Sequence, residues 1–322
     1  MENRGAGRIG LAEFRPPCQH GSMASAYWFP APLPADFPCR VALRCARLVG
    51  LAYALYQQWS DAGKPPAARM RFRPVALGRI VLADPFWRTL TYRKPRPRGP
   101  KATGPRFQTM VEHTPAGACA ESGKILYMVF RGTIGNAEKI TNFMAGKEDA
   151  VFDDLPGGGV HRGFLRCYAT VRESILDFLE ARAGRDKTIR IAGYSLGGAL
   201  ASLAAMDVAT SWLPYRKLEV FTFASPRTGS VKWAEHYDRQ RQSSWRIANK
   251  QDPVAKVPFK FLGYRHVGVP LRFAALSGLA AHSLDNAYLP VLRAAAHPHR
   301  PTPQAKAASR SRNSVSVAAA TR

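Results

Sequence analysis

The chain has 322 residues, a formal net charge of +25 and a hydrophobic fraction of 46%. This length allows one large α/β domain with extensions or two smaller domains, and the apolar content is ample for a core. Five cysteines at irregular spacing form no Cys-x-x-Cys pair and no Cys/His cluster. The sequence therefore indicates neither a disulfide framework nor a zinc site, and we expect no metal or organic cofactor.

Much of the positive charge lies in two segments without acidic residues, 93–106 and 293–322. Basic segments of this kind bind nucleic acid or an anionic membrane surface in some proteins, and in others they are only solvated. We interpret both segments as solvated and keep peripheral contact with an anionic membrane as the alternative. Nucleic-acid binding is not expected.

The two ends of the chain differ in composition from the middle. Residues 1–37 are rich in Pro, Gly and Ala and lack the features of a secretory signal, so we predict a disordered extension or a mis-assigned start. Residues 298–322 are mainly Ser, Ala, Pro and Arg, which predicts a disordered basic tail. A single domain is expected over residues 38–297. The longest uncharged run, 48–60, is too short to cross a bilayer, so we expect a soluble or peripheral protein, in the cytoplasm by preference.

Between these ends, helical and strand patterns alternate. The predicted helices are 41–59, 160–183, 196–206, 231–240 and 282–296, and the predicted strands are 107–112, 124–130, 189–192, 218–224, 244–249 and one or two within 260–273. Residues 60–106 are expected to be mostly irregular. Because several strands are apolar on both faces, the pattern predicts a mostly parallel sheet with helices on both sides.

The most informative stretch is Gly193–Gly197, a Gly-x-Ser-x-Gly sequence between a buried strand and an Ala/Leu-rich helix. A sharp strand-to-helix turn projects its central side chain over the edge of the sheet, and the following helix aims backbone N–H groups at the same point. Ser195 is therefore a candidate nucleophile, and the N–H of Leu196 is a candidate oxyanion donor. The alternative is a glycine-rich turn with a serine cap.

A nucleophilic serine needs a base and a group that orients the base. Asp252 follows a predicted strand and precedes Pro253, which favours it over Asp207 and Asp238 as the acid. Among the histidines after Asp252, His282 is favoured because it follows a loose segment and opens a predicted helix. His266 is the alternative.

The oxyanion site needs a second donor on another loop, upstream of the nucleophile. Thr133 ends the sequence Phe130-Arg131-Gly132-Thr133, where a predicted strand turns. Its N–H and hydroxyl are both candidate donors. An ordinary strand-ending turn is the alternative interpretation.

Taken together, these residues resemble the fungal-type, or class 3, triacylglycerol lipase family of the α/β-hydrolases. The blocks that carry the resemblance are Phe130–Thr133, Val160–Phe164, Gly193–Gly198, Thr222–Gly229, Asp252–Val254, and His282 with Tyr288. The resemblance implies an α/β-hydrolase fold, a triad of Ser195, Asp252 and His282, and an oxyanion hole formed by Thr133 and Leu196. His161 and His266 match family positions outside the triad.

Members of this family carry a short amphipathic lid after the oxyanion residue. The corresponding segment runs from residue 134 to 150, with Ile140, Phe143 and Met144 as candidates for its apolar face. Glu138-Lys139 and Asn142-Phe143 stand where the family usually has an Asp-Trp and an Asp-Leu pair. The family's aromatic anchor is therefore missing here.

We therefore expect a serine hydrolase that cleaves carboxylic esters of lipids through an acyl-enzyme. Within enzymes, the alternative is an esterase or a phospholipase A-type enzyme. From another class, the alternative is a catalytically idle lipase-fold protein that binds lipid or signals.

Overall fold

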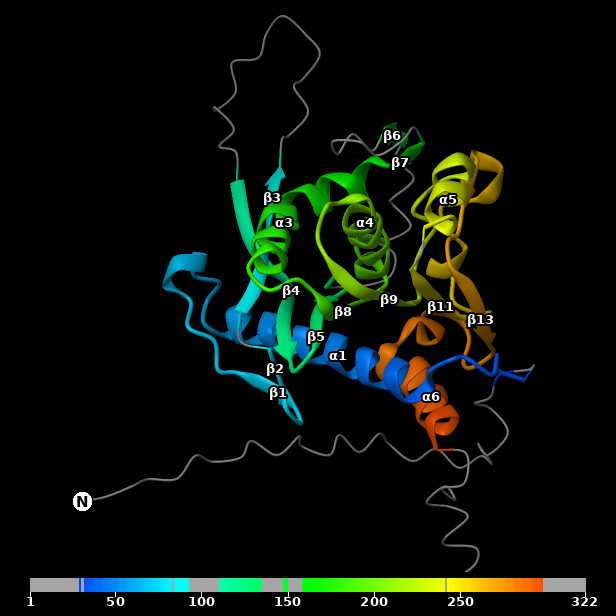
Figure 1. Ribbon diagram of the computed structural model, residues 1–322, viewed down its shortest axis with the longest axis horizontal. Helices are drawn as coiled ribbons and strands as arrows, with labels where there is room; N and C mark the ends of the chain where they lie inside the picture. Colours follow the sequence, from blue (N-terminus) through cyan, green and yellow to red (C-terminus); the bar gives the residue numbers. More distant parts are fainter. Residues whose placement is uncertain are drawn as a thin grey trace, which may run out of the picture.

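The computed structural model describes residues 29, 32–82, 84–92, 110–134, 147–149, 158–240 and 242–297. A seven-stranded sheet forms its centre, in the spatial order β13-β11-β9-β8-β5-β4-β3 (Figure 1). The strands are β3 (Asp84–Tyr92), β4 (Met110–Ser122), β5 (Ile125–Phe130), β8 (Gly184–Tyr194), β9 (Tyr215–Phe223), β11 (Ser243–Asn249) and β13 (Val269–Phe273). From β5 to β13 all neighbours are parallel, and β3 and β4 add an antiparallel edge. The predicted mostly parallel sheet is confirmed.

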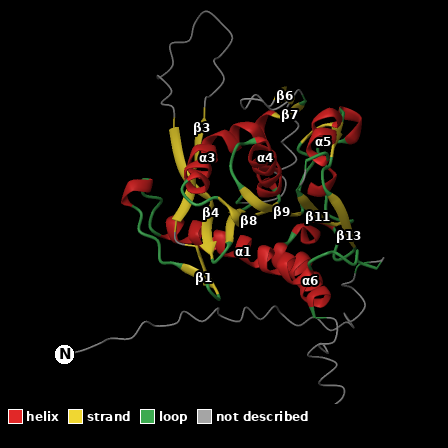
Figure 2. Ribbon diagram, in the orientation of Figure 1, coloured by secondary structure: helices red, strands yellow, loops and turns green. Residues whose placement is uncertain are grey.

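Helices cover both faces of this sheet (Figures 1 and 2). On one face lie α1 (Cys39–Asp61) and α6 (Leu289–Ala296), whose apolar side chains share a core with inward-facing residues of β8, β9, β11 and β13. On the other face lie α3 (Arg162–Glu180) and α4 (Leu196–Thr210), which share a second core with the opposite side of the sheet. Helix α4 is buried nearly all round, which explains its mainly apolar, Ala- and Leu-rich composition.

Two smaller sheets, one further α-helix and short 3₁₀ turns complete the described structure. The hairpin β1 (Val75–Leu77) and β2 (Ile80–Leu82) turns at Gly78. The second sheet has the order β12-β10-β7-β6, with β6 (Lys147–Asp149), β7 (Gly159–His161), β10 (Gly229–Ser230) and β12 (Tyr264–Arg265). Helix α5 (Val231–Asp238) follows β10 directly.

The structure departs from the predicted elements in three places. Residues 75–92, expected to be irregular, form β1, β2 and β3, and β4 extends far beyond the predicted strand 107–112. The second half of β4 was missed because it consists of small residues and Pro115, which have low strand propensity. Those small residues are required by packing: a Cβ at Gly117 would overlap the ring of Phe86 and the carbonyl of Val129.

The predicted helix 282–296 is broken into three pieces. A 3₁₀ turn at Gly278–His282 leads into a π turn at Leu284–Tyr288, and only then does α6 begin. Ser283 caps the π turn by accepting a hydrogen bond from the N–H of Asn286. Pro290 stands at the start of α6, where its missing N–H does no harm. His282 therefore ends a tight turn and does not open a helix.

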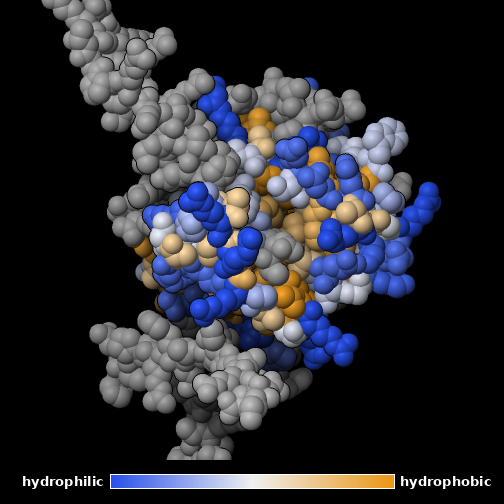
Figure 3. All heavy atoms as spheres, turned by 90° about the vertical axis from the view of Figure 1, so that its left-hand side faces the viewer, coloured by the Kyte–Doolittle hydropathy of each residue, from blue (hydrophilic) through white to orange (hydrophobic). Residues whose placement is uncertain are grey.

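Several expectations concern residues outside the described part of the chain. These are the candidate lid residues Ile140, Phe143 and Met144, the whole basic segment 93–106, and residues 1–28 and 298–322. The domain boundaries near residues 37 and 298 therefore stay predictions. No described helix is both long and apolar enough to cross a membrane. On the face shown in Figure 3, hydrophilic side chains surround exposed apolar patches.

Candidate active site

Ser195 lies at the sharp turn between β8 and α4, with φ of 57° and ψ of −127°. A residue other than glycine rarely adopts a positive φ, so the surrounding structure must hold it there. Cβ atoms at Gly193 and Gly197 would overlap the carbonyls of Gly197 and Phe130, respectively. The backbone N–H of Ser195 donates to the carbonyl of Phe223 at 2.9 Å and ties the turn to β9. The sequence pattern and the observed turn agree.

Ser195, His282 and Asp252 form one hydrogen-bonded chain. The Oγ of Ser195 lies 2.9 Å from Nε2 of His282. The Nδ1 of the same ring lies 3.0 and 2.9 Å from the two carboxylate oxygens of Asp252. A carboxylate only accepts hydrogen bonds, so Nδ1 carries the proton, which leaves Nε2 of the neutral ring free to accept the serine hydroxyl. This is the tautomer in which Nε2 can take up a proton.

Asp252 is completely buried, and two groups besides His282 donate hydrogen bonds to its carboxylate. The backbone N–H of Val254 donates to Oδ1 at 2.9 Å, and the hydroxyl of Tyr288 donates to Oδ2 at 2.7 Å. Burial, together with the charge of Asp252, raises the pKa of Tyr288 well above its ordinary value, so its hydroxyl stays protonated. These donors supply what water would otherwise give the buried charge.

Asn249, at the end of β11, ties the Asp252 loop to the His282 loop. Its side-chain amide donates to the carbonyls of Ala275 and Ala281 and accepts from the N–H groups of Gln251 and Ala275. The sequence analysis assigned it no role, although its position three residues before Asp252 was visible. Tyr194 was also missed: its ring stacks on His282 with the centroids 5.0 Å apart.

The turn after β5 lies beside the serine. A Cβ added at Gly132 would come within 2.9 Å of the Ser195 Cβ. Arg131 fixes this turn by donating from Nε to the carbonyl of Pro115 at 2.6 Å and from Nη1 to that of Gly132 at 2.7 Å. The Oγ1 of Thr133 is buried and has no hydrogen-bond partner among the described residues. Gly132, the residue before Thr133, thus lies beside Ser195, and Leu196 follows the serine as the first residue of α4.

The competing candidates have other partners. Asp207 accepts hydrogen bonds from Tyr168 at 2.7 Å and from Arg172 at 2.7 and 3.0 Å, which accounts for its burial in α4. His266 shares a hydrogen bond of 2.9 Å with the carbonyl of Ala255. His161 caps α3 by accepting from the N–H groups of residues 163 and 164. Among the described residues, no cluster of His, Cys, Asp and Glu side chains could hold a metal ion.

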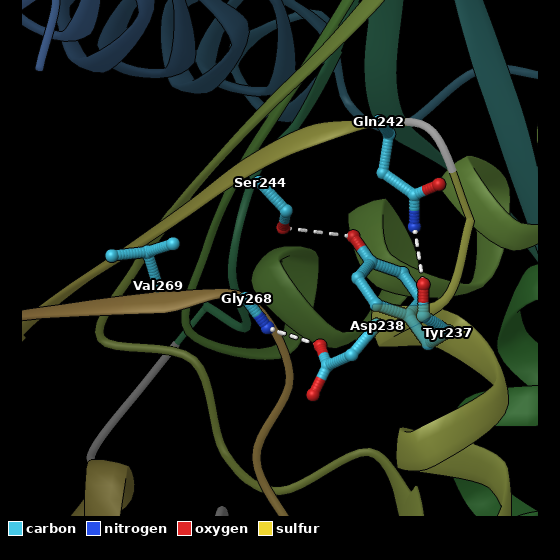
Figure 4. Close-up of a pocket in the computed structure, with 6 residues that line it drawn as sticks. All are labelled: Tyr237, Asp238, Gln242, Ser244, Gly268 and Val269. Atoms are coloured by element: carbon cyan, nitrogen blue, oxygen red, sulfur yellow. Dashed lines mark hydrogen bonds between the residues drawn. The ribbon is translucent and has the colours of Figure 1, made fainter. Parts of the chain in front are cut away.

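The remaining candidate acid, Asp238, belongs to a pocket at the other end of the sheet. It accepts a hydrogen bond of 2.9 Å from the N–H of Gly268 (Figure 4). The pocket has a volume of about 260 Å³ and lies at the beginning of β11, whereas Asp252 follows the end of that strand. Its lining consists of Tyr237, Asp238, Gln242, Ser244, Gly268 and Val269.

Comparison with known proteins shows which family and which proteins the sequence resembles. Residues 127–262 match the model of the family described as lipase (class 3). A secreted mono- and diacylglycerol lipase of Fusarium solani is 32% identical over 145 residues, which cover 44% of this chain and 42% of that protein. The chloroplastic/mitochondrial phospholipase A1 EG1 of Oryza sativa subsp. indica is 32% identical over 205 residues, covering 52% and 47%. The chain thus spans less than half the length of these two relatives.

These names give no support to the expected cytoplasmic location, because they describe a secreted and an organellar protein. Among solved structures, the mono- and diacylglycerol lipase from Aspergillus oryzae shares the fold with a TM-score of 0.52 and 19% identity. That likeness covers 78% of this chain and 85% of the fungal one. The expected α/β-hydrolase fold is confirmed. Over residues 127–262, the chain is similar to the class 3 lipase family.

Proposed function

We propose that this protein is a serine hydrolase that cleaves carboxylic esters of lipids. The observation that carries the proposal is the hydrogen-bonded chain from Ser195 through His282 to Asp252, with the serine on a strained turn at the start of a helix. A neutral imidazole that accepts from a serine hydroxyl and donates to a buried carboxylate is poised for nucleophilic catalysis.

In the proposed mechanism, Nε2 of His282 takes the hydroxyl proton while Oγ of Ser195 bonds to the ester carbonyl carbon. The resulting imidazolium is stabilised by Asp252. His282 then returns the proton to the leaving alcohol as the C–O bond breaks, which leaves an acyl-enzyme. A water molecule attacks the acyl group by the same proton transfers, releases the carboxylic acid and restores the serine.

The negative charge on the carbonyl oxygen would be held by the N–H of Leu196 and by Thr133. The unpartnered Oγ1 of Thr133 supports this assignment, because its hydroxyl can donate to an oxyanion without giving up another hydrogen bond. Helix α4 adds the positive end of its dipole at the same point. Removing one such donor typically lowers the rate by about 10²–10³.

Two exposed apolar residues beside the site support a lipid-like substrate. Ile134, next to Thr133, is 39% exposed, and Leu279, in the turn that ends at His282, is 55% exposed. Exposed apolar side chains around a polar centre suit an ester with a hydrocarbon chain. The phospholipase A1 name of one relative favours a phospholipase A-type activity as the second candidate.

The test is hydrolysis of p-nitrophenyl esters from acetyl to palmitoyl, followed by triacylglycerol and phosphatidylcholine. Ser195→Ala is compared with Ser202→Ala, which removes another buried serine hydroxyl from the same helix. We expect the first variant to lose about 10⁴–10⁶ of the rate and the second to keep it when corrected for folded protein. A wild type no faster than Ser195→Ala on every ester would overturn the proposal in favour of a lipid-binding protein.

A further inference from the structure

Three arginines gather beneath the Asp252 loop, on the face of the sheet opposite α1 and α6. Trp245 and Ile247 of β11 belong to the α1/α6 core, so Arg246 between them points to the other side. The same alternation in β13 turns Arg272 to that side, between Leu271 and Phe273 of the same core. The register pairs Arg246 with Pro270 and Ala248 with Arg272, so the two arginines are diagonal neighbours.

Arg227 completes the group from the loop that follows β9. Its backbone N–H donates to the carbonyl of Val257 at 2.8 Å, and its Nη1 donates to the carbonyls of Lys256 and Pro258. His266 joins from the loop after β12, hydrogen-bonded to Ala255. Arg227 and His266 therefore both hold the segment that comes directly after Asp252.

Among the described residues, neither buried guanidinium group forms an ion pair, although that of Arg227 donates to two backbone carbonyls. Arg246 is 6% exposed and Arg227 is 8% exposed. The Nε atoms of both are buried with no hydrogen-bond partner, and the Arg246 guanidinium makes no ion pair within the described part of the chain. Burying a charge in this way is costly unless an opposite charge is supplied.

The arginines also act on one another. Burial and the charges of Arg272 and Arg227 lower the pKa of Arg246 to about 10. The same three charges, together with burial, lower the pKa of His266 to about 2, so this ring adds no positive charge of its own. No carboxylate contributes to either shift. The cluster is therefore a concentration of positive charge with unused N–H donors.

We propose that Arg227, Arg246 and Arg272 form a binding site for a phosphate-type oxyanion. Guanidinium groups bind tetrahedral oxyanions through paired N–H donors, and two of these three are held in place by the sheet. Arg272 is exposed and forms the entrance, whereas Arg246 and Arg227 form the buried part. The ion is either free phosphate or the phosphate of a lipid headgroup.

An anion bound at this site would neutralise the repulsion between the arginines. Because the cluster holds residues 255–258, binding would stabilise the segment that carries Asp252. Binding does not depend on ester hydrolysis and is measurable with the full chain carrying Ser195→Ala. The first measurement is the thermal unfolding midpoint in rising inorganic phosphate, with potassium chloride keeping the ionic strength constant. An ion that binds only the folded state raises that midpoint.

Two variants and a control make the test specific. Arg272→Gln removes an exposed member of the cluster, and Arg246→Met removes a buried one. Arg44→Gln removes the same charge from an exposed position on α1, on the opposite face. We expect phosphate to bind Arg272→Gln and Arg246→Met at least about tenfold more weakly than the wild type, and Arg44→Gln to bind it as the wild type does.

A response of equal size in all four proteins would mean general screening of a cationic surface and would overturn the site. No phosphate response beyond chloride in the wild type would overturn it as well. Vesicles of phosphatidylcholine with and without phosphatidic acid then identify the source of the ion. Weaker binding of Arg272→Gln than of Arg44→Gln to the phosphatidic acid vesicles assigns the site to a lipid headgroup, and equal binding assigns it to free phosphate.

Discussion

Two buried charged side chains, one in β11 and one just after it, differ in their hydrogen-bond partners. Asp252, just after the end of β11, is fully buried and receives hydrogen bonds from Val254, Tyr288 and His282. Arg246, within β11, is almost as deeply buried, and its guanidinium has no protein partner among the described residues. Burial alone therefore does not say what a charged side chain does.

This difference indicates a different role for each group. A carboxylate whose oxygens are occupied by fixed donors holds a neighbouring imidazole in one orientation. A guanidinium with unused N–H donors can bind a ligand that the chain itself does not supply. Substitutions in these two environments should therefore have opposite effects. Four experiments on ester hydrolysis and stability measure the contrast.

The largest effect is expected from Asp252→Asn. The amide retains the shape of the carboxylate but cannot hold the same tautomer of His282, so we expect the rate of ester hydrolysis to fall by about 10⁴. The measurement is kcat on the preferred ester, corrected for folded protein by circular dichroism. Asp207→Asn is the control, because Asp207 is also buried but is hydrogen-bonded to Tyr168 and Arg172. A similar rate loss in both variants would contradict a special role for Asp252.

The next effect concerns stability and compares two buried arginines. Arg190 is paired with Glu219 in the neighbouring strands β8 and β9, so Arg190→Met leaves this buried carboxylate with Lys217 as its remaining ion-pair partner and should cost about 1.5–3 kcal/mol. Arg246→Met leaves no partner behind. We expect its free energy of unfolding in phosphate-free buffer to be unchanged or higher by up to about 4 kcal/mol. Urea titrations measure both, and equal losses would show that Arg246 is satisfied in a way the described residues do not reveal.

A smaller effect is expected from Tyr288→Phe. The substitution removes one donor from the Asp252 carboxylate and an acceptor from the N–H of Asn249. We expect kcat to fall about 10-fold with little change in KM, because the hydroxyl positions the triad and does not reach the substrate. Tyr237→Phe, which loses a bond to Ser244 far from the site, is the control. A change in KM alone would argue against positioning.

The smallest effect is a pH dependence at His266. Burial and the charges of Arg246, Arg227 and Arg272 lower its pKa in the folded protein from 6.5 to about 2. Between these values the unfolded chain binds a proton that the folded chain does not, so stability falls as the pH decreases below 6.5. The loss from this one group is at most about 1.4 kcal/mol per pH unit.

His266→Gln keeps a donor for the Ala255 carbonyl but cannot titrate. Unfolding free energies at about pH 7 and about pH 5 should therefore differ less in this variant than in the wild type. His297→Gln, at an exposed position, should leave the difference unchanged. Identical pH slopes in the wild type and His266→Gln would contradict a depressed pKa.

The sequence predicted those parts of the molecule whose signals are local. The strand, Gly-x-Ser-x-Gly turn and helix around Ser195 were readable because one short stretch contains both the periodicities and the glycines that the turn needs. The Asp252 and His282 candidates followed from chain order and loop position. The structure brings these three residues into hydrogen-bonded contact, and their catalytic role stays a prediction until it is measured.

The missed features depend on contacts between distant segments. Strand β4 is built from small residues whose place in the sheet is set by Phe86 and β5, so no local pattern announces it. Asn249 and Tyr288 form hydrogen bonds with residues that lie 26 to 39 positions away in the sequence. Their partners are known only when the loops meet.

What the sequence by itself determined is therefore the alternation of strands and helices, the turn at Ser195 and the resemblance to class 3 lipases, because propensity, periodicity and motif spacing are properties of neighbouring residues. Only the tertiary structure decided which carboxylate meets the histidine and which arginines are left without a counter-charge. Asp207 and Asp252 are both acidic residues after the serine, and Arg190 and Arg246 both lie in apolar strands. Electrostatic energy depends on distance in space and on burial, and neither is fixed until the chain has folded.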